Sequence, residues 1–103
     1  MEKSRLEMLQ EFSAANPNDS FGRYGLAQEY LKAGQPAKAL EQFRELLKVN
    51  PNYVAAYYHG GQTLEKLGLR EEARTLYTQG IEAATRTGDQ HARSELQAAL
   101  DLL

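Results

Sequence analysis

Apolar residues recur along this chain at intervals of three and four, the period of an α-helix, in six segments separated by turn residues. Near the start, Leu6, Leu9 and Phe12 form one apolar face, which either Ser13 or Ala14 extends. The later segments follow the same pattern and end at a glycine or at an Asn-Pro-Asn turn. The predicted helices span residues 2–15, 18–33, 36–49, 53–67, 70–87 and 89–103. The pattern therefore predicts an all-α protein.

The segment from residue 18 to residue 51 is followed by a second copy of itself, 34 residues further along the chain. Self-similarity at a fixed period marks a repeat architecture, so we expect stacked units that share a continuous core. The pairs of residues that match in this register are Pro17 and Pro51, Tyr24 and Tyr58, Gln28 and Gln62, Lys32 and Lys66, Gly34 and Gly68, Ala39 and Ala73, and Phe43 and Tyr77.

The first copy carries a recognisable motif. It reads Arg23-x2-Leu26-Ala27-x2-Tyr30, then Gly34, Ala39-x3-Phe43 and Pro51. This motif resembles the tetratricopeptide repeat (TPR) family of 34-residue helical hairpins. The resemblance implies a right-handed α-α superhelix, in a single domain over residues 1–103. Its expected parts are an N-terminal helix at 2–15 that resembles half a repeat, repeat 1 at 18–51, repeat 2 at 52–87 and a C-terminal capping helix at 89–103.

Two glycines stand inside the second copy where the first copy has leucines. Gly60 replaces Leu26 and Gly80 replaces Leu46, and each glycine costs its helix about 1 kcal/mol relative to alanine. One explanation is that tyrosines 57 and 77 fill the space that the leucines occupy. The other is that a second backbone, such as that of another protomer, approaches closely there. The sequence leaves both explanations open.

Helix ends are also marked in the sequence. Gly34, Gly68 and Gly88 each follow a periodic segment, and Asp19 and Asp89 stand where an N-cap is expected. The last segment has a single apolar stripe, which is displaced by about one residue from the position that a third repeat requires. We therefore expect a helix that caps the second hairpin. The residues of this stripe are Ala92, Leu96, Ala99, Leu100 and Leu103.

Composition narrows the class of protein. The chain has 103 residues, a net charge of −2 spread along its length, and no cysteine. The spread charge does not favour nucleic acid or an anionic membrane as partner, and no segment is apolar enough to be a membrane helix. Without cysteine there is neither a disulfide nor a thiolate metal site. We expect a cytoplasmic protein, and a chain that begins at Met1 with half a hairpin suggests a complete small protein.

No catalytic or metal-binding pattern is present in the sequence. His59 and His91 are 32 residues apart and lack the i, i+4 spacing of a zinc site. Glu71 and Glu72 fall in the first turn of a predicted helix, where acidic side chains offset the macrodipole. We therefore expect no enzyme activity, no metal and no cofactor.

The family resemblance also implies a binding surface. In TPR arrays the first helices of successive hairpins line a concave groove that accepts a peptide. The motif Tyr-x3-Gln-x3-Lys occurs in both of these helices and places its side chains on one helical face. The residues expected in the groove are Phe21, Tyr24, Gln28, Leu31, Lys32, Tyr58, His59, Gln62, Glu65 and Lys66.

Two functions follow from these observations. The leading hypothesis is a module that binds a peptide segment of an unidentified partner protein in the groove. The alternative is a structural protein that assembles with itself, as a homodimer or larger oligomer, through an exposed end of the solenoid. Leu100, Leu102 and Leu103 motivate this alternative, because they cannot all lie on one helical face and some apolar area could stay uncovered.

Overall fold

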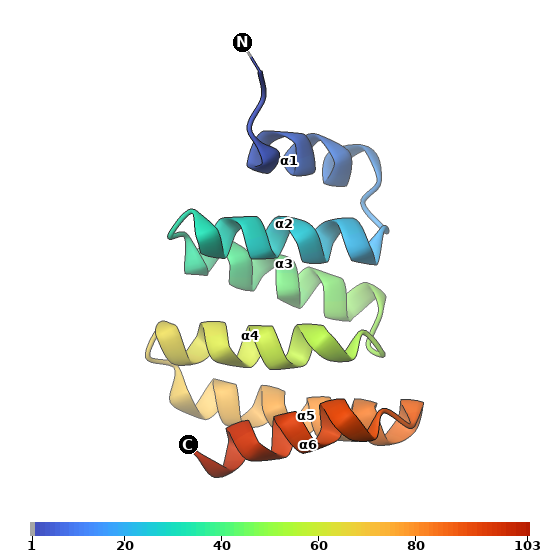
Figure 1. Cartoon of the computed structure of the whole chain (residues 1–103), viewed down its shortest axis with the longest axis vertical. Coiled ribbons are helices and arrows are strands. Elements are labelled where there is room, and N and C mark those ends of the chain that lie inside the picture. The colour runs from blue at the N-terminus through green and yellow to red at the C-terminus, as the bar shows by residue number, and fades with distance from the viewer. Residues whose placement is uncertain (1) are drawn as a thin grey trace.

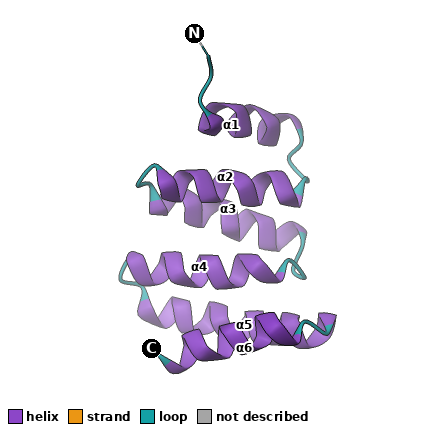
Figure 2. Ribbon diagram, viewed as in Figure 1, coloured by secondary structure: helices purple, strands orange, loops and turns teal. Residues whose placement is uncertain are grey.

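A computed structural model describes residues 2–103, so Met1 lies outside the described residues. All regular secondary structure in the described part of the chain is helical (Figure 2). The helices are α1 (Arg5–Ala15), α2 (Ser20–Lys32), α3 (Pro36–Val49), α4 (Val54–Lys66), α5 (Arg70–Thr87) and α6 (Gln90–Asp101).

The helices stack along the long axis of an elongated molecule that measures 46 × 28 × 19 Å. Figure 1 shows α2 paired with α3 and α4 paired with α5, with α2 and α4 in front and α3 and α5 behind. Helix α1 covers the upper end of the stack, against α2. Helix α6 covers the lower end and contacts both α5 and α4. Each hairpin therefore buries its apolar faces against its neighbours in sequence.

Side chains cap the starts of three helices. Ser4 accepts the backbone N–H of Glu7, while the carboxylate of Glu7 accepts the backbone N–H of Ser4. This capping box makes α1 begin at Arg5, and not at residue 2 as the periodicity suggested. Asp19 and Asp89 each accept a backbone N–H from three residues further on, which confirms both as N-caps.

Three glycines stand just after the last residues of helices, as predicted. Gly34, Gly68 and Gly88 have φ angles of 73°, 75° and 73°. A side chain is strained in this left-handed conformation, whereas glycine adopts it freely. These residues therefore let the chain turn sharply into the next helix.

Small residues let the two helices of each hairpin approach closely. Ala27 and Ala39 are fully buried between α2 and α3. In the second hairpin Gly61 and Ala73 hold the matching positions, and the ring of Tyr77 lies directly on Gly61. The prediction of close approach at these positions is confirmed.

The two interior glycines are covered by side chains of the same chain. A Cβ atom at Gly60 would lie 2.9 Å from a methyl group of Leu76, and one at Gly80 would lie 2.5 Å from the Cβ of Tyr57. The prediction that tyrosines fill the space of the missing leucines was therefore right for Tyr57, which covers Gly80. It was wrong for Tyr77, which packs on Gly61, while Leu76 covers Gly60. Since both glycines are buried within this fold, the alternative of a second protomer at these positions is wrong.

The two ends of the stack differ in the apolar area that they leave exposed. At the lower end, Leu100 and Leu103 pack against the core, and only Leu102 is exposed, at 87%. At the upper end, Met8 and Phe12 of α1 are 53% and 43% exposed. The exposed apolar surface therefore lies mainly at the end opposite to the one that the C-terminal leucines suggested.

Candidate functional site

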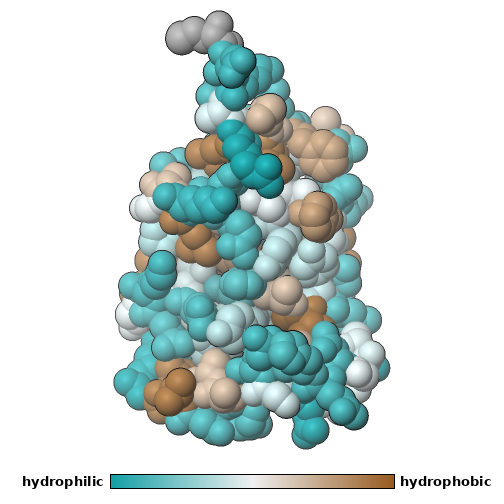
Figure 3. All heavy atoms as spheres, viewed as in Figure 1, coloured by the Kyte–Doolittle hydropathy of each residue, from teal (hydrophilic) through white to brown (hydrophobic). Residues whose placement is uncertain are grey.

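All ten residues expected in the groove lie on α2 and α4, with Phe21 in the first turn of α2. These two helices lie one above the other on the front of the molecule (Figure 1). In the same view, Figure 3 shows apolar groups as small separate patches among polar side chains, the largest at the level of α1 and α2. The surface of this face is thus mixed in character.

Four aromatic rings form a continuous row across this face, which we call the aromatic row. The centroids of Tyr53 and Tyr24 are 5.3 Å apart, those of Tyr24 and His59 5.8 Å, and those of His59 and Tyr58 5.3 Å. The two contacts of His59 are edge-on, the favoured geometry for aromatic pairs. All four side chains are half-buried. The row therefore joins α2 to α4 and leaves part of each ring open to a ligand.

Two tyrosines of the row, Tyr24 and Tyr58, also contact buried rings behind them. Tyr24 contacts the buried ring of Phe43 at 6.2 Å between centroids, and Tyr58 contacts the buried ring of Tyr77 at 6.5 Å. These are the same two positions of the 34-residue repeat, so the repeat reproduces this anchoring contact. Rings held in this way lose little freedom when a ligand packs on them.

His59 is the titratable member of the row. Burial lowers the pKa of its imidazole, and the more distant Glu95 carboxylate on α6 opposes this shift only in part. The ring is therefore neutral near pH 7 and presents one nitrogen as a donor and the other as an acceptor.

Several of the predicted residues already have partners within the protein. The amide nitrogen of Gln62 donates to the hydroxyl oxygen of Tyr58 at 3.0 Å, and Glu65 accepts a hydrogen bond of 2.5 Å from the hydroxyl of Tyr77. Leu31 packs against the buried core of the first hairpin. Glu65 and Leu31 thus have roles in the fold itself.

The structure brings together only part of the predicted set. Tyr24, His59, Tyr58 and Gln62 form one connected group, whereas Phe21 and Lys32 lie exposed near the two ends of α2. Sequence analysis missed Tyr53, which belongs to the aromatic row. Its position corresponds to Asp19 in the first copy, so the comparison of the two repeats contained no signal for it.

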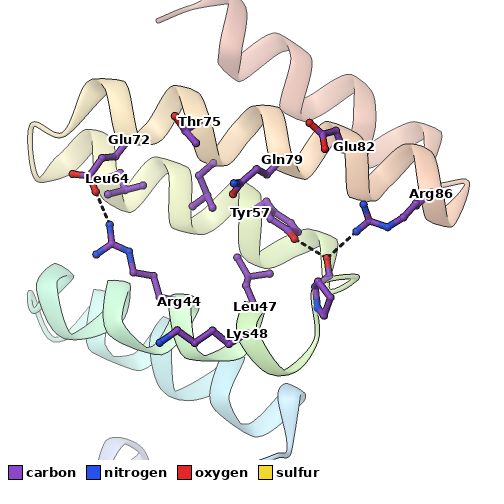
Figure 4. Close-up of a pocket in the computed structure, with 12 residues that line it drawn as sticks. Arg44, Leu47, Lys48, Tyr57, Leu64, Glu72, Thr75, Gln79, Glu82 and Arg86 are labelled. Atoms are coloured by element: carbon purple, nitrogen blue, oxygen red, sulfur yellow. Dashed lines mark hydrogen bonds and ion pairs between the residues drawn. The ribbon is translucent and has the colours of Figure 1, made fainter.

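A pocket lies on the other side of the molecule, in a groove that we call the outer groove. It runs between α3 and α5, is floored by α4 and has a volume of about 620 Å³. Figure 4 shows Leu47, Tyr57 and Leu64 pointing into it from α3 and α4. None of the ten predicted residues lines this groove.

Two further observations concern metal binding and membrane insertion. Within residues 2–103 no three His, Asp or Glu side chains come together as metal ligands would. Over the same residues, no helix combines the length and the apolar character that crossing a bilayer requires.

Comparison with known proteins agrees with this fold. The tetratricopeptide repeat family model matches residues 24–89. A TPR repeat-containing protein of Pseudomonas aeruginosa is 28% identical over 95 residues, which cover 92% of this chain and 90% of the relative.

Two solved structures are similar in both sequence and fold. The crystal structure of a tetratricopeptide repeat domain protein from Salinibacter ruber is 46% identical, covers 80% of this chain and 91% of its own, and superposes with a TM-score of 0.75. The solution structure of a protein from Bordetella parapertussis is 31% identical and superposes with a TM-score of 0.82. The match covers 97% of this chain and 87% of the other. The predicted right-handed α-α superhelix is therefore confirmed.

Proposed function

The chain belongs to the tetratricopeptide repeat family, and we propose that it is a non-catalytic interaction module that binds a peptide segment of a partner protein on the face of α2 and α4. The observation that carries this proposal is the aromatic row. It spans both helices, and its half-buried rings are held from behind by Phe43 and Tyr77.

The chemistry around the row suits a peptide ligand. Tyrosine offers a large contact area with few rotatable bonds, and is therefore enriched among the residues that dominate binding energy. Gln28 and Gln62 can donate to and accept from a peptide backbone. Lys32 and Lys66, one turn further along each helix, can pair with carboxylates of the ligand. A peptide with apolar side chains and a nearby acidic residue fits this arrangement best.

The test is affinity capture from a lysate of the source organism, followed by binding measurements with peptides of the captured protein. We expect a Tyr24→Ala, Tyr58→Ala variant to lose the peptide. Because these rings also pack within the fold, a second variant changes only exposed charges, Lys32→Glu with Lys66→Glu. It should weaken binding of an acidic peptide about tenfold or more, since hydrogen bonds to charged groups contribute about 1.5–3 kcal/mol.

The matched control is Lys48→Glu, an exposed charge reversal on the opposite face. It should bind the peptide as wild type does, and all variants should keep the helical circular dichroism of wild type. A partner that binds wild type, the double tyrosine variant and the double lysine variant equally well would show that the face of α2 and α4 is not the binding site.

A further inference from the structure

The outer groove has walls of opposite charge. Arg44 and Lys48 stand on the α3 wall, whereas Glu72 and Glu82 stand on the α5 wall, which ends at Arg86 (Figure 4). The floor between them is apolar and is built from Tyr57 and Leu64 of α4. A ligand of this groove therefore needs an apolar ridge with acidic groups along the side that faces α3.

The groove favours a helix over an extended peptide. Both of its walls are helices whose backbone N–H and C=O groups are bonded within the helix, so they offer no edge to an extended backbone. The hydroxyl of Thr75 is also used, because it donates to the carbonyl of Glu71 at 3.2 Å. A helix satisfies its own backbone groups and brings only side chains to the apolar floor.

Two contacts across the groove set its length. Arg44 pairs with Glu72 at 2.8 Å at one end, and Arg86 donates to the carbonyl of Pro51 and to Asn52 at the other. Glu72 and Arg86 are 14 residues apart on α5, which corresponds to about 21 Å of helix. Helix α1 has 11 residues and is about 16 Å long, so it is short enough to lie between these contacts.

Helix α1 has an apolar ridge of the required kind. Met8 and Phe12, four residues apart, are its exposed large apolar side chains, and we call them the α1 ridge. At 3.6 residues per turn, Glu7 and Glu11 lie on one side of this ridge and Arg5 lies on the other. The acidic side of the ridge thus complements the basic α3 wall of the groove. Within its own chain Arg5 pairs with Glu29 and Glu11 pairs with Lys3, so docking exchanges the exposed Lys3–Glu11 pair for one with the α3 wall.

The spacing of these charges also agrees. The two glutamates of the ridge are four residues apart, as are Arg44 and Lys48. When α1 lies parallel to α3 and α5, its glutamates face the basic wall of Arg44 and Lys48, while Arg5 keeps its ion pair with Glu29 of its own copy. The antiparallel orientation would bring the same glutamates to the acidic wall, against Glu72 and Glu82. One orientation is therefore favoured by charge.

We propose that the chain assembles with itself by docking the α1 ridge of one copy into the outer groove of a second copy. This interface joins two different surfaces, so each added copy leaves one free ridge and one free groove. The assembly can therefore grow beyond a dimer. Two copies cannot instead pair groove to groove, because two concave surfaces would leave the apolar floors uncovered.

The interface is small and partly electrostatic, which determines how it should be measured. Interfaces below about 1,200 Å² are usually weak, so we expect a Kd between about 1 µM and 1 mM. The flanking charges are exposed, and salt should therefore weaken the association. This proposal uses neither the aromatic row nor the peptide site of the proposed function.

The test is sedimentation equilibrium of the full chain between 10 µM and 1 mM. The wild-type mass should rise beyond that of a dimer and should fall again in 1 M salt. A ridge variant, Met8→Lys with Glu11→Lys, and a groove variant, Arg44→Glu with Lys48→Glu, should each remain monomeric. Mixed in equal amounts they should form a one-to-one dimer and nothing larger, because each retains the surface that the other lacks.

A matched double charge reversal on the face of α2 and α4, Lys32→Glu with Lys66→Glu, should assemble as wild type does. This control separates the two proposals, since it removes the peptide site and leaves the ridge and the groove intact. Three results would each overturn the proposal: a wild-type protein that stays monomeric to 1 mM, a mixture of variants that does not dimerise, or a variant that assembles alone. A wild-type protein that stays monomeric and instead binds a helix of another protein in the outer groove would also overturn the proposal.

Discussion

The hydroxyl of Tyr77 donates a hydrogen bond of 2.5 Å to the carboxylate of Glu65, and thereby ties α5 to α4 at the centre of the second hairpin. The Tyr77 side chain is fully buried, with its ring on Gly61, while Glu65 is exposed. Burial first, and the neighbouring Glu65 carboxylate second, raise the pKa of this tyrosine. The phenol is therefore a permanent donor at physiological pH.

Removal of this hydroxyl should destabilise the protein. We expect Tyr77→Phe to lower the free energy of unfolding by about 1–2 kcal/mol, as the loss of a hydrogen bond to a charged group does. Urea unfolding followed by circular dichroism measures the change. Tyr58→Phe is the matched control: its hydroxyl bonds only to the exposed Gln62, so its effect should stay below about 0.5 kcal/mol. Equal losses in both variants would contradict this assignment.

Two glycine-to-alanine substitutions should have opposite effects. A Cβ at Gly61 would collide with the ring of Tyr77, so Gly61→Ala should cost about 1–3 kcal/mol. A Cβ at Gly25 would lie 3.6 Å from a methyl group of Leu9, an ordinary contact. Gly25→Ala should therefore stabilise α2 by up to about 1 kcal/mol. Thermal melts of both variants beside wild type check the two signs, and a stabilising Gly61→Ala would show that the packing is looser than described.

Helix α1 is held to α2 by an ion pair with a buried carboxylate. Arg5 lies 2.8 Å from the buried carboxylate of Glu29. The position that matches Arg5 in the first repeat is occupied by Ala39, so this ion pair is particular to α1. Arg5→Ala should cost about 1–2 kcal/mol, because Glu29 keeps only the more distant Lys32. Hydrogen exchange should localise the loss to α1. Uniform loss of protection across all helices would argue for a global effect instead.

The pKa of His59 gives a pH dependence of known sign. Because burial lowers its pKa in the folded state, the unfolded state binds the proton more readily. The free energy of unfolding should therefore be unaffected by this group above pH 7 and should fall as the pH drops through the unfolded value of about 6.5. Denaturant titrations between pH 7.5 and 5.5 measure this slope.

A substitution at each histidine tests the assignment of this slope. We expect His59→Gln to flatten the pH dependence, whereas His91→Gln should keep it, because His91 is exposed on α6. A slope that persists in the His59 variant would have to come from another group.

Local patterns in the sequence were sufficient to predict the helices and most of their ends. Asp19, Asp89, Gly34, Gly68 and Gly88 act on the backbone within a few residues of themselves, so their roles depend little on the rest of the fold. The 34-residue register also predicted which helices pair, since small residues recur where the helices of a hairpin meet. The apolar stripe of α6 was correct for the same reason: its period identifies one face without reference to a neighbour.

Only the tertiary structure decided which surfaces stay open. Periodicity shows that a face is apolar, but not how far the next helix lies from it or which side chain covers it. For this reason the sequence pointed to the C-terminal leucines, while the fold exposes Met8 and Phe12. The position of Tyr53 beside Tyr24, and the outer groove between α3 and α5, depend on distances between elements far apart in the chain. Those distances result from side-chain packing, which cannot be derived from local sequence patterns.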